Sequence, residues 1–191
     1  MDFTKDQLDE IQFMMYRFRD LNSMVPEDAY KDIVETIDTF LQRPDYKEQL
    51  TCGSVKNCSM CCHDSIPMGM VEGRIMKKFI VDNNIPFNKE RVILQNNNAL
   101  LKWEDKACPL LGDEVDGTRL CTIYENRPLI CRTHNSGSHP SVCLPDNELN
   151  KVEVMISAVM ALTFIAYDLE SPRAEGEVPE LTNMHEILKD L

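Results

Sequence analysis

Thiol side chains are the residues of this sequence whose number and spacing predict chemistry. Eight cysteines lie in the middle of the chain, and residues 1–51 and 144–191 contain none. They are Cys52, Cys58, Cys61, Cys62, Cys108, Cys121, Cys131 and Cys143. Thiolates bind zinc and iron–sulfur clusters strongly. The clustering therefore predicts that these eight cysteines are metal ligands, for zinc or for an iron–sulfur cluster.

The spacing within the first group of cysteines gives a more specific prediction. Cys58 and Cys61 have the Cys-x-x-Cys spacing with which a tight turn directs two thiolates at one ion. Cys62 follows directly, and adjacent side chains tend to point in different directions. Two neighbouring thiolates therefore favour two nearby centres or a polynuclear cluster over one mononuclear site. Two four-sulfur sites fit the number of cysteines, and so does one site with spare thiols.

Several polar side chains near the cysteines are candidates for supporting the ligands. Lys56, Arg127 and Arg132 can offset thiolate charge, and exposed surface charge is the alternative for all three. Tyr124 and Glu125 can form a polar site with Arg127; alternatively, Arg127 donates to a thiolate or carbonyl and Tyr124 packs. The nearby histidines can replace a thiolate, or lie beside the site or on the surface: His63, His134 and His139.

Two other uses of cysteine stay open at this point. Disulfides need an oxidising compartment, and buried cysteines can serve as small apolar core residues. The N-terminus lacks the basic start and apolar stretch of a secretory signal. We therefore expect a cytoplasmic protein, in which thiols stay reduced.

Charge and hydropathy limit the partners. The formal net charge of −12 repels nucleic-acid backbones and anionic membranes, so we expect neither as a partner. The longest uncharged run, residues 154–167, is too short to span a bilayer and is typical of a buried helix. A protein partner or protein substrate remains open.

The elements that must position the cysteines are predicted to be mostly helical. We expect one domain, 1–191, in which helices flank a central cysteine-rich, metal-stapled loop region with a small β-hairpin. Its parts are an N-terminal helical pair at 1–50, a cysteine-cluster core at 51–145, and a long helix with a tail at 146–191. Helical periodicity, caps and breakers predict helices at 5–21, 26–43, 69–84, 88–103 and 146–169, a hairpin around 112–117, and a short tail helix.

Three segments of the sequence resemble the YkgJ-type cysteine-cluster family, which has a CxxCxxCC-like signature. They are Asn-Cys58-Ser-Met-Cys61-Cys62, Cys108-Pro-Leu-Leu, and Cys121-Thr-Ile-Tyr-Glu-Asn-Arg-Pro-Leu-Ile-Cys131-Arg132. The resemblance covers residues 52–143 and implies chelation of zinc or iron. Cys52 departs from the family spacing because it lies six residues before Cys58, and Cys143 lies on a loop of variable length.

These observations leave three functions. The first is a metal-binding protein in which zinc or an iron–sulfur cluster cross-links the loops. The second follows from the resemblance alone, because the family includes flagellin lysine methylases: an iron–sulfur-dependent protein lysine methyltransferase using S-adenosylmethionine. The third is an electron-transfer or redox-sensing module, which requires iron with a reversible potential.

Overall fold

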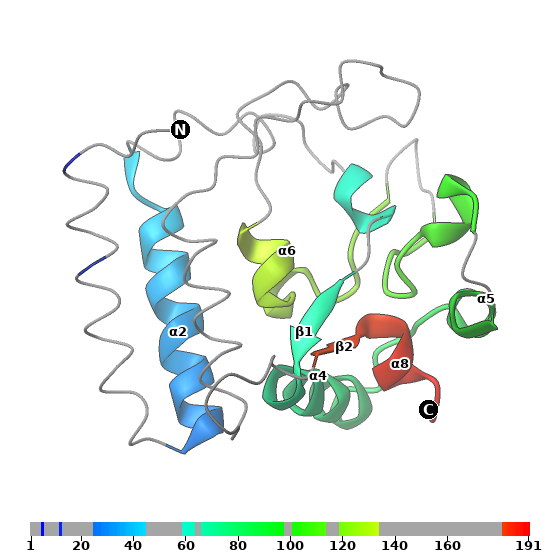
Figure 1. Ribbon diagram of the computed structural model, residues 1–191, viewed down its shortest axis with the longest axis horizontal. Coiled ribbons are helices and arrows are strands. Elements are labelled where there is room, and N and C mark those ends of the chain that lie inside the picture. Colours follow the sequence, from blue (N-terminus) through cyan, green and yellow to red (C-terminus); the bar gives the residue numbers. More distant parts are fainter. Residues whose placement is uncertain are drawn as a thin grey trace.

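The protein is predominantly helical in a computed structural model (Figure 1). The structure describes Lys5, Gln12 and residues 25–44, 59–63, 66–97, 101–113, 119–133 and 181–191. Across these ranges, helices are joined by one two-stranded antiparallel sheet. The mostly helical class is therefore confirmed. The predicted helix at 146–169 lies outside the described residues, and of the helix at 5–21 only Lys5 and Gln12 are described, both helical.

Helix α2, Pro26–Leu41, is the longest described helix. Pro26 occupies the first helical position, where proline loses no hydrogen bond, and Glu27 and Asp28 favour the positive end of the helix dipole. Tyr30, Ile33 and Ile37 are buried on one face. The structure confirms the predicted helix that begins at Pro26, and its buried face packs on residues 70–82 and on residues 129–133.

Helix α4, Met70–Asp82, follows β1 directly and buries Val71, Met76 and Ile80. It ends where the backbone of Asn84 turns into the left-handed region, at φ 49°. Asparagine tolerates this conformation better than most residues. The helix predicted at 69–84 is thus confirmed.

Helix α5, Lys89–Asn97, is shorter than the predicted helix at 88–103. Asn88 begins it, with its side-chain oxygen accepting the backbone N–H of Arg91 at 3.0 Å. The prediction was wrong at the other end: Trp103–Lys106 forms a separate 3₁₀ helix, η3. The asparagines at 96–98 have low helix propensity, which accounts for an early end.

The sheet joins two segments that are distant in the sequence. Strand β1, Pro67–Gly69, pairs antiparallel with β2, Leu181–Asn183. The short helix α8, Met184–Leu188, begins directly after β2, and the backbone N–H of Asn183 donates to Glu186 Oε2 at 2.8 Å. This confirms the tail helix. The strand pairing itself was not predicted.

The predicted hairpin around 112–117 is present as a short antiparallel bridge. Leu111 pairs with Cys121, and the N–H of Gly112 donates to the carbonyl of Leu120 at 2.9 Å. On the other side of the bridge, the N–H of Thr122 donates to the carbonyl of Leu110 at 2.9 Å. Residues 114–118 of the turn lie outside the described ranges.

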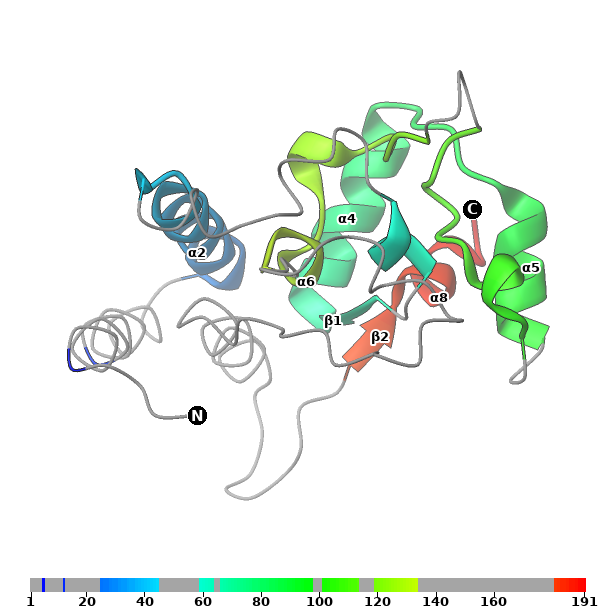
Figure 2. The same ribbon diagram turned by 90° about the horizontal axis from the view of Figure 1, so that it is seen from above.

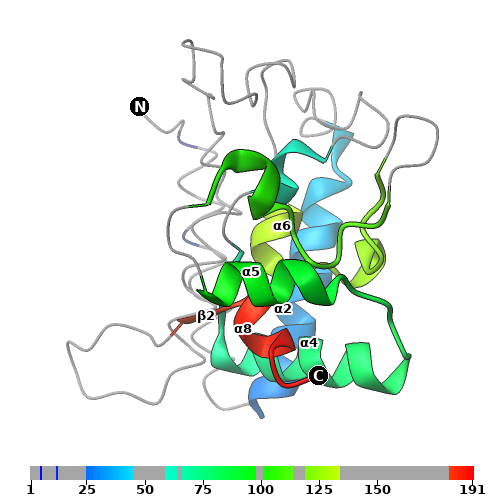
Figure 3. The ribbon, with the colours of Figure 1, turned by 90° about the vertical axis from the view of Figure 1, so that its right-hand side faces the viewer.

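The described elements from residue 66 to residue 188 share one apolar core, and α2 packs beside it on α4 and on α6 (Leu129–Thr133). Figures 1 and 2 show α2 on one side and α5 on the other, with α4, α6 and the sheet between them. Figure 3 shows α8 beside α5, and α8 also packs on α4. Met68, Leu110 and Leu188 lie in this core with almost no exposed surface. Across the described ranges, no helix combines the length and the apolar character needed to cross a membrane.

Candidate metal centre

The first cysteines of the site lie in a tight turn. The 3₁₀ helix η2, Met60–His63, contains Cys61 and Cys62, and the N–H of Cys62 donates to the carbonyl of Ser59 at 3.0 Å. The two thiols are hydrogen-bonded to each other. Cys58, the partner of Cys61 in the Cys-x-x-Cys spacing, lies outside the described residues, so the turn between these two cysteines stays a prediction.

The hairpin carries the next two cysteines to this turn. The N–H of Cys108 donates to the carbonyl of Cys62 at 2.6 Å, which fixes the hairpin against η2. Cys108 is buried, and Cys121 is half-buried in the bridge with Leu111. Backbone contacts between distant segments therefore bring Cys108 and Cys121 to the turn of η2, from which both are far in the sequence.

Backbone N–H groups point at both hairpin sulfurs. The N–H of Leu110 bonds to the thiol of Cys108, and the N–H of Ile123 bonds to the thiol of Cys121. Each donor lies two residues after its cysteine. Such bonds favour the thiolate, which is the form that binds metal. Each half of the hairpin thus supplies a backbone donor to its own sulfur.

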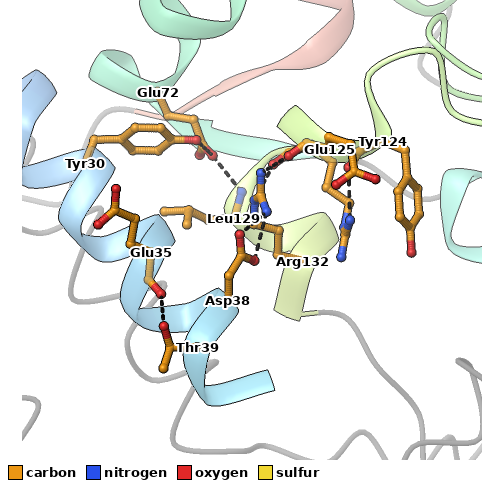
Figure 4. A network of polar contacts seen from close by, with 10 residues as sticks. Tyr30, Glu35, Asp38, Thr39, Glu72, Tyr124, Glu125, Leu129 and Arg132 are labelled. Carbon is orange, nitrogen blue, oxygen red and sulfur yellow. Dashed lines mark hydrogen bonds and ion pairs between the residues drawn. The ribbon is translucent and has the colours of Figure 1, made fainter. Parts of the chain in front are cut away.

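Cys131 lies in α6, and the fully buried carboxylate of Glu72 holds the start of this helix. Glu72 Oε1 accepts the backbone N–H of Leu129 at 2.7 Å and the hydroxyl of Tyr30 at 3.0 Å. The first N–H groups of a helix have no partner within the helix, so this bond supplies one. Figure 4 shows Tyr30 and Glu72 pointing toward each other beside Leu129.

The described thiols are close enough to change each other's protonation. The pKa of Cys62 is raised by its hydrogen bond with Cys61, by burial, and by charge on Cys61, Cys108 and Cys121. Burial raises the pKa of Cys131 well above its usual range, and charge on Cys108, Cys61 and Cys121 adds to this. Five cysteines from three chain segments therefore lie in one region: Cys61, Cys62, Cys108, Cys121 and Cys131.

Burial is the main cause of the raised pKa of the hairpin thiols. It raises the pKa of Cys108 to about 12 against the opposing influence of Arg91, and it raises the pKa of Cys121 against that of Arg127. Glu72 acts in the opposite sense, because its negative charge raises the pKa of Cys131. Two cations thus favour thiolates on the hairpin, and one carboxylate disfavours a thiolate on α6.

Arg91 is a supporting residue that the sequence did not indicate. Its Nη1 donates to the carbonyl of Cys108 at 3.2 Å and to that of Leu111 at 2.7 Å. Nothing in the sequence predicts that an arginine on a helix contacts the backbone of a residue 17 positions later. The same holds for Glu72, which resembles an ordinary acidic residue in the first turn of a helix.

Arg127 and Tyr124 form a stacked pair beside Cys121. The guanidinium of Arg127 lies 4.2 Å from the centre of the Tyr124 ring, and its Nη1 donates to the Tyr124 carbonyl at 2.9 Å. The predicted role of Arg127 as a carbonyl donor is confirmed. Tyr124 packs against Arg127 but is 58% exposed, so it is not part of the interior.

Arg132 is buried, so the alternative of a surface charge was wrong for this residue. Its Nη1 contacts both carboxylate oxygens of Asp38 on α2, at 2.8 and 2.7 Å. Figure 4 shows these two side chains facing each other between α2 and α6. Arg132 directly follows Cys131 in the sequence, so this ion pair ties the helix that carries a candidate ligand to α2.

His63 is also buried, and its ring stacks on Trp103 of η3 with centroids 3.9 Å apart and planes 13° from parallel. Its Nδ1 lies 3.3 Å from the carbonyl of Ser59. The surface alternative for His63 was therefore wrong. Trp103 is the single tryptophan of the chain, so the stack joins it to the turn that carries Cys61 and Cys62.

The remaining predicted residues lie outside the described ranges: Cys52, Cys58, Cys143, Lys56, His134 and His139. Within the described residues, no three His, Cys, Asp or Glu side chains are arranged to hold a metal ion. The donor chemistry nevertheless fits zinc or an iron–sulfur cluster, because several thiols converge beside backbone N–H donors and two cations.

Comparison with known proteins defines the class. A family model described as "CxxCxxCC: Putative zinc- or iron-chelating domain" matches residues 51–155, more than half of the chain. The chain therefore belongs to the CxxCxxCC family, and the resemblance to the YkgJ-type cysteine cluster is confirmed. Neither the curated proteins nor the solved structures gave a significant match.

Proposed function

We propose that this protein binds metal through its eight cysteines, and that the metal cross-links the segments that carry them. One observation carries the proposal: five thiols from η2, the hairpin and α6 converge in the part of the chain that matches a zinc- or iron-chelating family. The predicted ligands are the five converging cysteines together with Cys52, Cys58 and Cys143.

The electrostatics of the region support a bound cation. Several thiolates brought together in a partly buried region repel one another, so without a cation they keep their protons. A metal ion reverses this balance, because it binds thiolates and displaces the protons. Arg91 and Arg127 offset part of the remaining negative charge at Cys108 and Cys121.

The connectivity supports a structural role for the metal. Among the described residues, the hydrogen bond from the N–H of Cys108 to the carbonyl of Cys62 joins η2 to the hairpin directly, and a metal bound by cysteines of η2, the hairpin and α6 would add a further cross-link. Structural zinc contributes about 10–16 kcal/mol of apparent binding free energy in small zinc-binding peptides, and this becomes folding free energy. This chain also buries an apolar core, so we propose that metal binding adds to the stability of the 51–145 core and that the metal-free chain still folds.

Measuring the metal and sulfide content of the purified protein identifies the metal. The full-length chain is purified without oxygen, and its zinc, iron and acid-labile sulfide are measured. About two zinc ions without sulfide indicate four-cysteine zinc sites, and iron with equal sulfide indicates a cluster. A folded chain with less than a tenth of an equivalent of either metal contradicts the proposal. Methyl transfer and electron transfer remain predictions from the sequence, and each requires the iron result.

A further inference from the structure

Helix α2 precedes the segment matched by the family model, yet it packs directly against the cysteine core. It contacts both α4 and α6, and α6 carries Cys131. Among the described residues, two of its side chains make hydrogen bonds to that core, Tyr30 with Glu72 and Asp38 with Arg132, and Glu27 makes a longer, exposed contact with Arg74. The second contact bears on the candidate metal centre most directly, because Arg132 is next to Cys131.

All three nitrogens of the Arg132 guanidinium donate hydrogen bonds. Nε donates to the carbonyl of Arg127 at 2.9 Å, Nη2 donates to the carbonyl of Glu125, and Nη1 donates to the carboxylate of Asp38. The side chain is 6% exposed. A planar guanidinium fixed at three positions holds a rigid geometry among the groups it joins.

These bonds span the stretch of chain between Cys121 and Cys131. The chain between them contains the carbonyls of Glu125 and Arg127, and Arg132 binds both from its position on α6. The guanidinium therefore closes the loop that separates the two cysteines. A change in its orientation moves this loop relative to α6, and with it the distance between the two thiols.

Asp38 fixes that orientation from the opposite side. A buried guanidinium needs a partner that offsets its charge and accepts its hydrogen bonds. Asp38 is 44% exposed, so its Coulomb energy is partly screened. The contact mainly fixes the orientation of the Arg132 guanidinium, because its Nη1 lies within 2.8 Å of both Asp38 oxygens.

We infer that Asp38 is a positioning residue of the metal centre: its carboxylate orients Arg132, and Arg132 sets the spacing of Cys121 and Cys131. The N-terminal helix, outside the family segment, is then part of the machinery that holds the metal. This inference rests on the proposed function, since it concerns the same site.

The test compares matched variants of α2 in the full-length chain. Asp38→Asn keeps the shape of the side chain and removes the charge and one acceptor. Glu27→Gln is the control, because Glu27 also joins α2 to α4 through Arg74, in an exposed contact of 3.9 Å. Asp38→Glu restores a carboxylate. Each protein is purified anaerobically with its native metal, and loss of metal to excess chelator is followed well below the melting temperature.

We expect Asp38→Asn to lose metal about tenfold faster than the wild type, at the low end of the effect of removing a residue that supports metal ligands. Glu27→Gln should match the wild type, and Asp38→Glu should recover most of the loss. A purely structural role for Asp38 would lower the melting temperature and leave the metal spectrum unchanged. The visible spectrum of iron, or of cobalt substituted for zinc, should therefore shift in Asp38→Asn alone.

Release and spectrum identical to the wild type in Asp38→Asn would overturn the inference and leave the proposed function intact. A wild-type chain that holds no metal would overturn the proposed function, and the inference with it. Should Asp38→Asn not fold, Arg132→Lys takes its place. Lysine keeps the positive charge but cannot make the three hydrogen bonds of the guanidinium, so metal should again be lost faster than from the wild type. An unchanged rate of metal loss would contradict the inference.

Discussion

At the scale of single residues, the protonation of the thiols distinguishes the metal-free protein from the metal-bound one. Burial and the charge of neighbouring thiols raise the pKa of Cys108, Cys121 and Cys131, and the hydrogen bond with Cys61, burial and neighbouring charge raise that of Cys62. A raised pKa means that folding favours the protonated thiol. Metal binding requires the opposite form, so the same side chains respond to pH differently in the two states.

This gives a prediction for the metal-free protein. The usual thiol pKa is 9.0, and that of Cys108 in the fold is about 12. Because the folded pKa lies above the unfolded one, the stabilisation is complete below pH 9 and is lost as the pH rises toward 12. The melting temperature of the metal-free chain should fall over this range. Cys108→Ala should make the melting temperature depend less on pH over this range. A melting temperature that falls as steeply in Cys108→Ala as in the wild type would contradict the raised pKa of Cys108.

Single-cysteine substitution gives a second residue-scale prediction. Cys121→Ser should lower the bound metal or speed its loss by at least about tenfold, because a hydroxyl is a far weaker ligand for zinc or iron than a thiolate. Thr122→Ser is the control: it lies next to Cys121 and keeps the hydroxyl that donates to the carbonyl of Leu110 at 3.1 Å. Equal metal content and release in the two variants would argue against Cys121 as a ligand.

The sequence indicated the cysteines and several polar neighbours in the same segments, but not the residues that reach the site from other helices. Thiols stand out because they are rare and clustered. Arg91, Glu72 and Asp38 belong to charged types that usually lie on the surface, and nothing local marks a long-range partner. Their roles depend on contacts across 17, 57 and 94 residues, respectively. Only the fold brings such groups together.

At the scale of secondary-structure elements, buried polar contacts join α2 and α4 to α6. Glu72 on α4 receives one hydrogen bond from each of the other two helices, through Tyr30 and Leu129. A hydrogen bond to a charged group contributes about 1.5–3 kcal/mol. These contacts therefore help to fix the short helix that carries Cys131.

Tyr30→Phe should lower the free energy of unfolding by about 2 kcal/mol, since the buried carboxylate of Glu72 loses a donor while the ring remains. Thr39→Ala on the same helix is the control. The Thr39 hydroxyl makes an exposed bond to the carbonyl of Glu35 at 2.8 Å, so its loss should cost less than about 0.5 kcal/mol. Chemical denaturation of the metal-free proteins measures both. Equal effects would mean that the Tyr30–Glu72 contact does not join the helices.

Gly73 tests the packing of β2 and α8 against α4. A Cβ at this position would lie 2.9 Å from Thr182 Cγ2 and 3.3 Å from Ile187 Cγ2. Alanine gains about 1 kcal/mol of helix propensity, but overpacking costs about 1–3 kcal/mol. Gly73→Ala should therefore destabilise the protein. Adding Thr182→Ser removes the nearer methyl group and should restore stability, whereas stabilisation by Gly73→Ala alone would contradict this packing.

Elements with strong periodicity were predictable, and the two short strands were not. Apolar spacing predicted α2 and α4, because a long amphipathic stripe is unlikely by chance. Strands β1 and β2 are three residues each, too short to show alternation, and they pair across more than a hundred residues. The early end of α5 at Asn97 shows that weak propensity limits a helix where packing does not sustain it.

At the scale of the whole molecule, the cysteine core is held from both ends of the chain. The C-terminal segment supplies β2 and α8, which pair with β1 and pack on α4 and α5. The N-terminal helix α2 contacts α4 and α6. Both flanking elements lie outside residues 51–155. The family segment alone therefore lacks contacts that the full-length chain provides to its cysteine-bearing elements.

X-ray absorption spectroscopy of the metal in the anaerobically purified full-length chain tests the central claim most directly. If cysteine thiolates hold the metal, the scattering atoms around it are sulfur, at about 2.3 Å for zinc. An iron–sulfur cluster adds an iron–iron distance to the same sulfur environment. A metal surrounded only by nitrogen or oxygen, at about 2.0–2.2 Å, would contradict the claim that the eight cysteines form the metal centre of this protein.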